Sequence, residues 1–156
     1  MLFRQNGRKA GCKTKFLLFI LSKTATFIAN LQSLPAMIQW IRMQLYSHGL
    51  GETTIRKIEL ASEEALVNII KHGYKQWMGF VQIELKSFAA HVEIILRDHG
   101  PPFNPLEQEI SFNPMATLEE RSLGGLGILF IRQNMDEVRY RREKNANVLM
   151  LVKKLR

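Results

Sequence analysis

The most regular pattern of apolar and polar residues lies between Thr53 and Gly73. Its apolar positions recur at steps of three and four residues, which places them along one stripe of a helix: Ile55, Ile58, Ala61, Ala65, Leu66, Ile69 and Ile70. The pattern predicts a helix that runs to about His72 with this stripe facing a core. Thr53 or Thr54 is the predicted N-cap, and Gly73 is predicted to end the helix.

The stretch before this helix predicts a strand and another helix. Thr24 to Asn30 is rich in β-branched and aromatic residues, which favour a strand. The next segment has helical spacing, tolerates Pro35 in its first turn, and stops at Ser47-His48-Gly49. Its periodic apolar positions are Leu31, Leu34, Met37, Ile38, Ile41 and Leu45.

A period of two residues predicts a β-hairpin in the middle of the chain. Phe80 to Ser87 alternates apolar and polar residues, and Val92 to Leu96 repeats a β-rich run after a turn at Phe88 to His91. The second strand leads into Arg97-Asp98-His99-Gly100-Pro101-Pro102-Phe103-Asn104-Pro105, where the prolines and the glycine prevent regular structure. Asp98 is therefore predicted to stand at a strand end, facing whatever lies beside the sheet.

The C-terminal third predicts a loop, a helix and two strands. Residues 104 to 123 show no long periodic segment, and a loop of this length is typical of a lid or of a disordered segment. The turn Gly124-Gly125-Leu126-Gly127 precedes a predicted helix with Ile128, Leu129, Ile131 and Met135. Two strands, Glu137 to Arg142 and Asn147 to Val152, are predicted to join at Lys144-Asn145-Ala146.

Composition and charge narrow the possible partners. The chain has 156 residues and is 46% hydrophobic, which suits one domain with a substantial core. Its net charge of +8 suits nucleic acid, a membrane surface or an acidic protein. The basic runs lack interleaved stacking aromatics, so direct nucleic-acid binding is unsupported. The single cysteine, Cys12, allows no internal disulfide and fits a reducing compartment.

The first 22 residues form a basic and apolar leader whose status stays open. Basic residues followed by Phe16 to Leu21 imitate a secretory signal, but this apolar run of six residues is far below the roughly 20 that span a bilayer. The other readings are a disordered basic leader with a short strand, or a start codon assigned too far upstream. We therefore expect a leader at residues 1–22, a single domain at 23–156, and no membrane partner.

Two patterns suggest chemistry. Glu64 and Asn68 lie four residues apart, so they project from one helix face at the rim of the apolar stripe. Their oxygens suit Mg²⁺ or the alignment of a hydroxyl, although such a pair is more often a solvated helix edge. Glycines just before a helix, as at 124–127, let backbone N–H groups approach a phosphate, although glycine-rich turns also arise from packing alone.

The order of these motifs resembles the N, G1 and G2 boxes of the GHKL ATPase superfamily. Within it the chain is most similar to the small bacterial anti-sigma factor serine kinases of stress-response and sporulation switches. Three stretches carry the resemblance, which covers about residues 24–155: Ser62-Glu63-Glu64-Ala65 to His72-Gly73-Tyr74, Pro101-Pro102-Phe103-Asn104-Pro105, and Met135-Asp136-Glu137-Val138. Pro102 stands where the broad superfamily often has glycine, which favours this subgroup over topoisomerase or chaperone relatives.

The resemblance implies a fold and roles for residues. The expected fold is a two-layer α/β (α+β) sandwich of Bergerat type, in which helices cover one face of a mixed, mainly antiparallel sheet. Glu64 would be the general base, Asn68 would hold Mg²⁺, and Asp98 would accept a hydrogen bond from the adenine of ATP. The remaining expected cofactor contacts are His72, Gly100, Pro102, Phe103, Arg121, Gly124, Gly125, Leu126 and Gly127. For His72, an interaction with the C-terminal helix dipole is an equally open interpretation.

The function implied by the resemblance is a partner switch. The chain would be a cytoplasmic anti-sigma factor and a serine/threonine protein kinase that uses Mg²⁺ and ATP to phosphorylate a small anti-sigma factor antagonist. Its expected partners are that antagonist, a sigma factor and a second copy of itself. Two alternatives are a non-catalytic, ATP-gated protein-binding regulator and an ATPase module of a larger regulatory assembly. A histidine-containing phosphoacceptor helix is absent from the sequence, so autophosphorylation on histidine is not expected.

Overall fold

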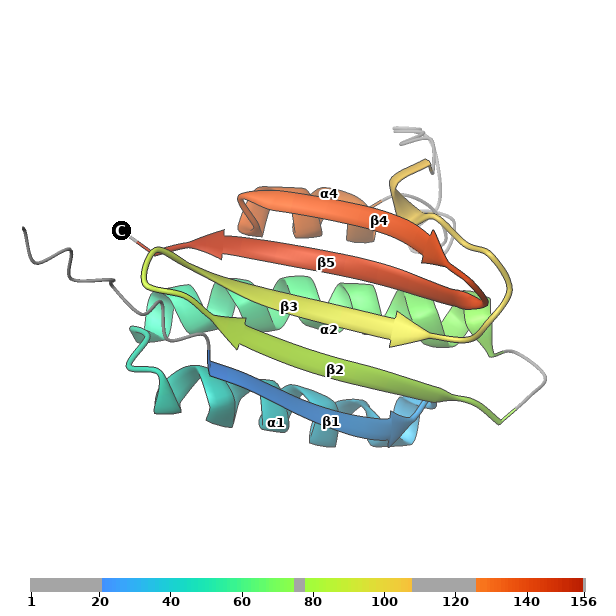
Figure 1. Cartoon of the computed structure of the whole chain (residues 1–156), viewed down its shortest axis with the longest axis horizontal. Coiled ribbons are helices and arrows are strands. Elements are labelled where there is room, and N and C mark those ends of the chain that lie inside the picture. Colours follow the sequence, from blue (N-terminus) through green and yellow to red (C-terminus); the bar gives the residue numbers. More distant parts are fainter. Residues whose placement is uncertain (1–20, 75–77, 108–125, 156) are drawn as a thin grey trace, which may run out of the picture.

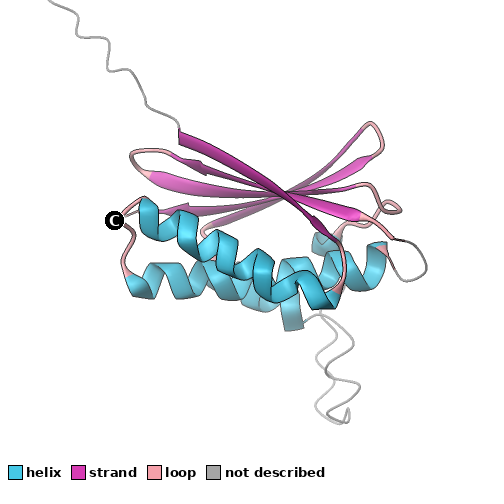
Figure 2. Cartoon of the chain, turned by 90° about the horizontal axis from the view of Figure 1, so that it is seen from below, coloured by secondary structure: helices cyan, strands magenta, loops and turns pink. Residues whose placement is uncertain are grey.

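Among the described residues, the sheet has five strands in the order β1-β2-β3-β5-β4, and helices cover one of its faces (Figures 1 and 2). The computed structural model describes residues 21–74, 78–107 and 126–155. Every strand pairing in this part is antiparallel, and the expected sandwich with helices on one face is confirmed. The strands are β1 Leu21–Ile28, β2 Phe80–Ser87, β3 His91–Asp98, β4 Glu137–Glu143 and β5 Ala146–Lys154. The helices are η1 Leu31–Ser33, α1 Leu34–Ser47, α2 Glu52–Gly73, η2 Pro105–Glu107 and α4 Leu126–Asn134.

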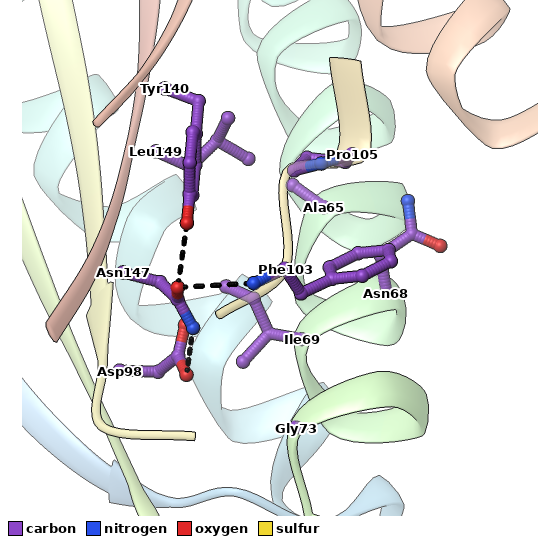
Figure 3. A pocket seen from close by; sticks show the side chains of 10 residues that line it. All are labelled: Ala65, Asn68, Ile69, Gly73, Asp98, Phe103, Pro105, Tyr140, Asn147 and Leu149. Carbon is purple, nitrogen blue, oxygen red and sulfur yellow. Dashed lines mark hydrogen bonds between the residues drawn. The ribbon is translucent and has the colours of Figure 1, made fainter. Parts of the chain in front are cut away.

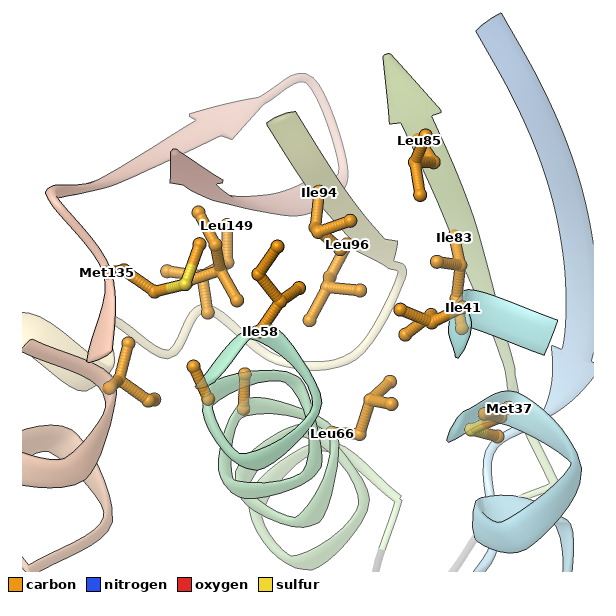
Figure 4. Close-up of a cluster of buried hydrophobic side chains, with 14 of the residues drawn as sticks. Met37, Ile41, Ile58, Leu66, Ile83, Leu85, Ile94, Leu96, Met135 and Leu149 are labelled. Atoms are coloured by element: carbon orange, nitrogen blue, oxygen red, sulfur yellow. The ribbon is translucent and has the colours of Figure 1, made fainter. Parts of the chain in front are cut away.

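The apolar stripe of α2 forms the centre of the core. All seven of its predicted residues are buried, and five of them, from Ile55 to Leu66, are fully inaccessible. All but Ile70 belong to one core cluster with the inward-facing residues of the sheet, including Ile83, Ile94 and Leu149 (Figure 4). Along β2, buried residues that face the helices occur at every second position, which confirms the alternation predicted for Phe80–Ser87.

Both ends of α2 differ from the prediction. The N-cap is Gly51, whose carbonyl oxygen accepts hydrogen bonds from Thr54 N and Ile55 N, and no side chain caps the helix. The prediction of a threonine cap was wrong, because the turn after α1 ends at Gly51 and places Thr54 inside the first helical turn. Gly73 is itself helical, and Tyr74 is the C-cap.

Strand β1 is displaced from its predicted position. It starts at Leu21, which pairs with Ser87, and ends at Ile28, because it follows β2 along the full length of that strand. Asn30 instead caps η1 by accepting a hydrogen bond from Ser33 N at 2.8 Å. Leu31 belongs to η1 and is 51% exposed, whereas Pro35 occupies the first turn of α1 as predicted.

Ion pairs cover apolar residues on the sheet face away from the helices. Val148 lies beside Arg97 and Arg141 in the register. It is only 1% exposed, although the described helices all cover the other face of the sheet (Figure 2). Both arginines bond to Glu143, at 3.0 Å and 2.6 Å. Long charged side chains shield apolar surface with their hydrocarbon stems, which explains the burial of Val148. In the described part of the chain, no helix is long and apolar enough to cross a membrane.

Replacing Ser62 with alanine is expected to leave the protein as stable or to make it more stable. Ser62 is fully buried in α2, and its hydroxyl has no hydrogen-bond partner among the described residues. A buried hydroxyl without a partner costs about 1–3 kcal/mol, and alanine is the better helix former. The free energy of unfolding, measured with urea, should stay level or rise by about 1 kcal/mol. A loss of that size would show that the hydroxyl has a partner.

Candidate functional site

The middle of helix α2 carries the Glu64 and Asn68 pair, which lies against Gly127 of the predicted glycine turn. Figure 1 shows α4 beside α2, and the first turn of α4 faces Glu64 and Asn68. A Cβ atom built on Gly127 would lie 2.7 Å from Glu64 Oε2 and 3.6 Å from Asn68 Nδ2. Any larger residue would push the carboxylate aside, so glycine allows the backbone of α4 to approach both polar side chains.

The last turn of α2 lies against the third predicted motif, the turn that follows Asp98. Asp98 ends β3 and is only 3% exposed. Its Oδ1 accepts hydrogen bonds from Gly100 N at 2.8 Å and from Asn147 Nδ2 at 3.0 Å. A Cβ atom on Gly100 would lie 2.9 Å from the Cα atom of Gly73. The turn after β3 therefore packs backbone against backbone on the last turn of α2.

A pocket connects these motifs between α2 and the sheet (Figure 3). Asn68 lines one side of it and Asp98 the other, and Phe103 lies in the segment that closes it. Its remaining lining residues are Ala65, Ile69, Gly73, Pro105, Tyr140, Asn147 and Leu149. The volume in this conformation is about 10 Å³, which is room for one water molecule. A larger ligand therefore requires the pocket to widen.

Asn147 is a buried hydrogen-bond hub that the sequence did not single out. The sequence predicted it only as a strand residue, but the register places it opposite Asp98. It is 5% exposed, and both ends of its carboxamide are bonded. Its Oδ1 accepts from Arg142 Nη1 at 2.7 Å, Tyr140 Oη at 2.8 Å and Phe103 N at 3.3 Å, and its Nδ2 donates to Asp98 Oδ1 and to Pro101 O at 2.9 Å.

The other predicted cofactor contacts fall into three groups. His72 and Phe103 stack with their ring centroids 4.3 Å apart, so His72 contacts the segment that closes the pocket. Pro102 and Leu126 are exposed at the surface. The predicted contacts Arg121, Gly124 and Gly125, together with most of the predicted loop at 104–123, lie outside the described residues. Tyr74, which no sequence pattern placed at the site, accepts a hydrogen bond from His99 N at 2.8 Å.

Burial controls the acidity of Asp98. Removal of its carboxylate from water raises the pKa of Asp98 above the ordinary value. The hydrogen bonds from Asn147 and Gly100 and the nearby charges of Arg142 and His99 oppose this shift without cancelling it. A raised aspartate pKa at a pocket wall marks a group whose burial is retained against a cost in stability, as is common at binding sites.

Replacing Gly100 with alanine is expected to destabilise the protein by about 1–3 kcal/mol, the usual cost of overpacking. The new methyl group would meet the backbone of Gly73, which cannot rotate away as a side chain can. Urea denaturation measures the loss. Gly51→Ala is the control for the added methyl group, since no atom lies within 4 Å of a Cβ there; it should cost less than about 1 kcal/mol, because alanine is a poorer N-cap than glycine. Equal losses in the two variants would contradict the packing explanation.

Sequence comparison with known proteins gives one family match and two similar relatives. Residues 27–153 match the family described as the histidine kinase-like ATPase domain. The chain is 32% identical over 100 residues to the serine-protein kinase RsbW of Bacillus subtilis (strain 168), covering 62% of each protein. It is 30% identical over 106 residues to that of Bacillus licheniformis, covering 65% of this chain and 66% of the relative. The chain thus matches less than two thirds of the length of either relative.

A solved structure supports the fold. The crystal structure of the RsbU and RsbW domains of a Mycobacterium tuberculosis protein superposes with a TM-score of 0.60 at 15% identity. The match covers 85% of this chain and 32% of that one. At this identity the likeness concerns the fold alone. The sequence resemblance to the GHKL superfamily and to its small serine kinases is confirmed by these matches taken together.

Proposed function

The chain belongs to the histidine kinase-like ATPase family, and on this basis we propose that it is an ATP-dependent serine/threonine protein kinase acting on a small anti-sigma factor antagonist. One observation carries the proposal. A single helix, α2, places Glu64 and Asn68 against Gly127 and, nine residues further on, places Gly73 against the turn that follows Asp98. At a rise of 1.5 Å per residue these two centres lie about 13 Å apart along the helix. That separation suits a ligand that is recognised at one end and reacts at the other.

The residues present fit ATP. Asp98 offers a buried carboxylate whose described hydrogen bonds both go to Oδ1, so Oδ2 is left to accept from the amino group of adenine. Gly100 and Gly73 keep this wall free of side chains. The described residues contain no group of three or more His, Cys, Asp or Glu side chains that could hold a metal. Mg²⁺ would therefore be held by Asn68 together with phosphate oxygens of ATP, as is usual for this ion.

Glu64 is the proposed general base. ATP, when bound, supplies the phosphoryl group and Mg²⁺ offsets its charge. Glu64 accepts the proton from the attacking serine or threonine hydroxyl of the antagonist. It is half-buried, one helical turn before Asn68, which lines the pocket. A protein that only binds ATP needs no base here, which favours a kinase over the non-catalytic regulator.

The partners follow from the same proposal. The unphosphorylated antagonist is the substrate, and its phosphorylation releases the kinase to hold a sigma factor. The net charge of +8 favours encounter with acidic protein partners. A cytoplasmic homodimer is the state we propose for this switch.

The decisive experiment is incubation of the purified chain with labelled ATP, Mg²⁺ and candidate small antagonist proteins of the same organism. Label on a serine or threonine of one candidate supports the kinase. Binding of ATP with label on none of the candidates would move the ATP-gated binding regulator to first place. Hydrolysis of ATP without any protein acceptor would favour the ATPase module. Failure to bind ATP at all would overturn the assignment of the pocket.

Acidification is expected to weaken ATP binding at a pH above the ordinary titration range of aspartate. Burial raises the pKa of Asp98. Two donors occupy Oδ1, so the added proton goes to Oδ2 and removes the acceptor that adenine uses. Calorimetric titrations between about pH 8 and about pH 4 measure the effect. The phosphates of ATP also titrate, and the Asp98→Asn variant corrects for them because it lacks the carboxylate. An identical pH dependence in both proteins would contradict the expectation.

A further inference from the structure

The Asn147 carboxamide lies beside the Asp98 carboxylate in the wall of the pocket. We propose that Asn147 is a positioning residue that sets the preference of this site for purine nucleotides with a 6-amino group. The inference rests on the proposed binding of ATP but assigns a role that neither the motifs nor the comparisons give to this residue. It follows from the donors and acceptors around one side chain.

The neighbours of Asn147 allow only one orientation of its amide. Arg142 Nη1 and Phe103 N are donors without acceptor capacity, so they require the carbonyl oxygen. The Asp98 carboxylate and the carbonyl oxygen of Pro101 are acceptors, so they require the NH₂ group. A flipped amide would oppose donor to donor and acceptor to acceptor on both sides. Asn147 therefore presents a fixed donor to Asp98.

This donor fixes the carboxylate of Asp98. The terminal torsion of an aspartate has a broad energy minimum, so packing or hydrogen bonds must select its orientation. Asn147 Nδ2 and Gly100 N both donate to Oδ1 and hold it toward the strand and the turn. Neither of these donors bonds to Oδ2. Without Asn147, only the Gly100 N–H holds the carboxylate among the described contacts.

The same side chain anchors the turn on which the base would rest. Asn147 Nδ2 donates to Pro101 O, and its Oδ1 accepts from Phe103 N. Arg142 bonds both to Asn147 Oδ1 and to Gly100 O, at 2.7 Å and 3.0 Å. The hairpin of β4 and β5 thus holds the acceptor and the adjacent backbone as one unit, and Tyr140 adds a third donor to Asn147 Oδ1.

Preorganisation of this kind produces selectivity. A site whose buried acceptor is fixed toward a donor rejects an analogue that lacks the donor, because the acceptor is then left unpaired. Inosine triphosphate is such an analogue, since it carries an oxygen where ATP has the amino group. A carboxylate released from Asn147 can rotate toward water or another donor, so the penalty against inosine triphosphate shrinks.

The test compares Asn147→Thr with Asn147→Val, two side chains of nearly equal shape. Only threonine offers a hydroxyl that donates to Asp98. Dissociation constants for ATP and inosine triphosphate, both with Mg²⁺, are measured for the wild type and both variants, and thermal melting confirms folding. We expect the wild type to prefer ATP by about 100-fold or more, the threonine variant to keep most of this ratio, and the valine variant to lose about tenfold of it.

The outcomes separate the inference from the proposed function. An unchanged ratio in Asn147→Val, or a wild type that binds ATP without discrimination, would overturn the positioning role. An equal loss of the preference for ATP in Asn147→Thr and Asn147→Val would also overturn it. A purely structural role would not depend on whether the side chain carries a hydroxyl. Failure of the wild type to bind ATP would instead remove the proposed function. Asn145→Ala, in the exposed turn of the same hairpin, is the control that should match the wild type. If the valine variant does not fold, Asn147→Ser and Asn147→Ala make the same comparison.

Discussion

The Glu64→Gln variant is expected to bind Mg·ATP but to transfer its phosphoryl group about 10²- to 10⁴-fold more slowly, the usual contribution of a general base. Glutamine has nearly the same size and shape as glutamate, so it should fit the same space beside Gly127 of α4. The amide accepts no proton at neutral pH. Single-turnover transfer of label to the antagonist measures the loss, and calorimetry measures ATP affinity on the same protein.

The neighbouring glutamate provides a matched control. Glu63 precedes Glu64 on α2 and is exposed to solvent, whereas Glu64 is half-buried beside α4. Glu63→Gln makes the same chemical change and should leave both transfer and ATP binding within about twofold of the wild type, since surface substitutions have small effects. If Glu64→Gln transferred phosphate as fast as the wild type, Glu64 would not be the base, although ATP binding would stand.

The Asp98→Asn variant is expected to lose ATP affinity by roughly 10- to 100-fold while keeping its fold. A hydrogen bond to a charged group contributes about 1.5–3 kcal/mol, and each 1.4 kcal/mol is a factor of ten. The asparagine oxygen still accepts from Gly100 N and Asn147 Nδ2, as Asp98 Oδ1 does. Its NH₂ group then faces the amino group of adenine, which places donor against donor. Fluorescence or calorimetric titration with ATP gives the affinity.

Although Asp98→Asn should bind ATP more weakly, we expect it to be at least as stable as the wild type. Burial raises the pKa of Asp98 above its ordinary value of 3.8, so the folded state holds this proton more tightly than the unfolded chain does. The free energy of unfolding of the wild type therefore falls as pH rises through the interval between these two values. At neutral pH, Asp98→Asn should melt at an equal or higher temperature than the wild type. A lower melting temperature, with ATP affinity unchanged, would show that the carboxylate is a structural group and no part of a nucleotide site.

Local pattern was sufficient for most elements of the fold. The stripe from Ile55 to Ile70, the limits of β2 and the helix that carries Ile128 and Ile131 all follow from periodicity, which is a property of neighbouring residues. The structure also places Leu126 and Gly127, predicted as part of the glycine turn, within this helix. The errors lie at element ends, as at Gly51 and Leu21. There the boundary depends on a preceding turn or on the length of a partner strand, and neither is visible in the residues of the element itself.

The candidate site divides in the same way. The sequence by itself determined which helix carries Glu64 and Asn68, and that Asp98 stands at the end of a strand, because spacing and turn chemistry act over a few residues. Only the tertiary structure decided that Gly73 meets Gly100, that Gly127 faces Glu64, and that Asn147 bonds to Asp98 across 49 positions of the chain. These contacts depend on strand register and helix packing, where one residue of slip turns a side chain to the opposite face. An asparagine in a strand therefore carries no mark of its role until its partner strand is known.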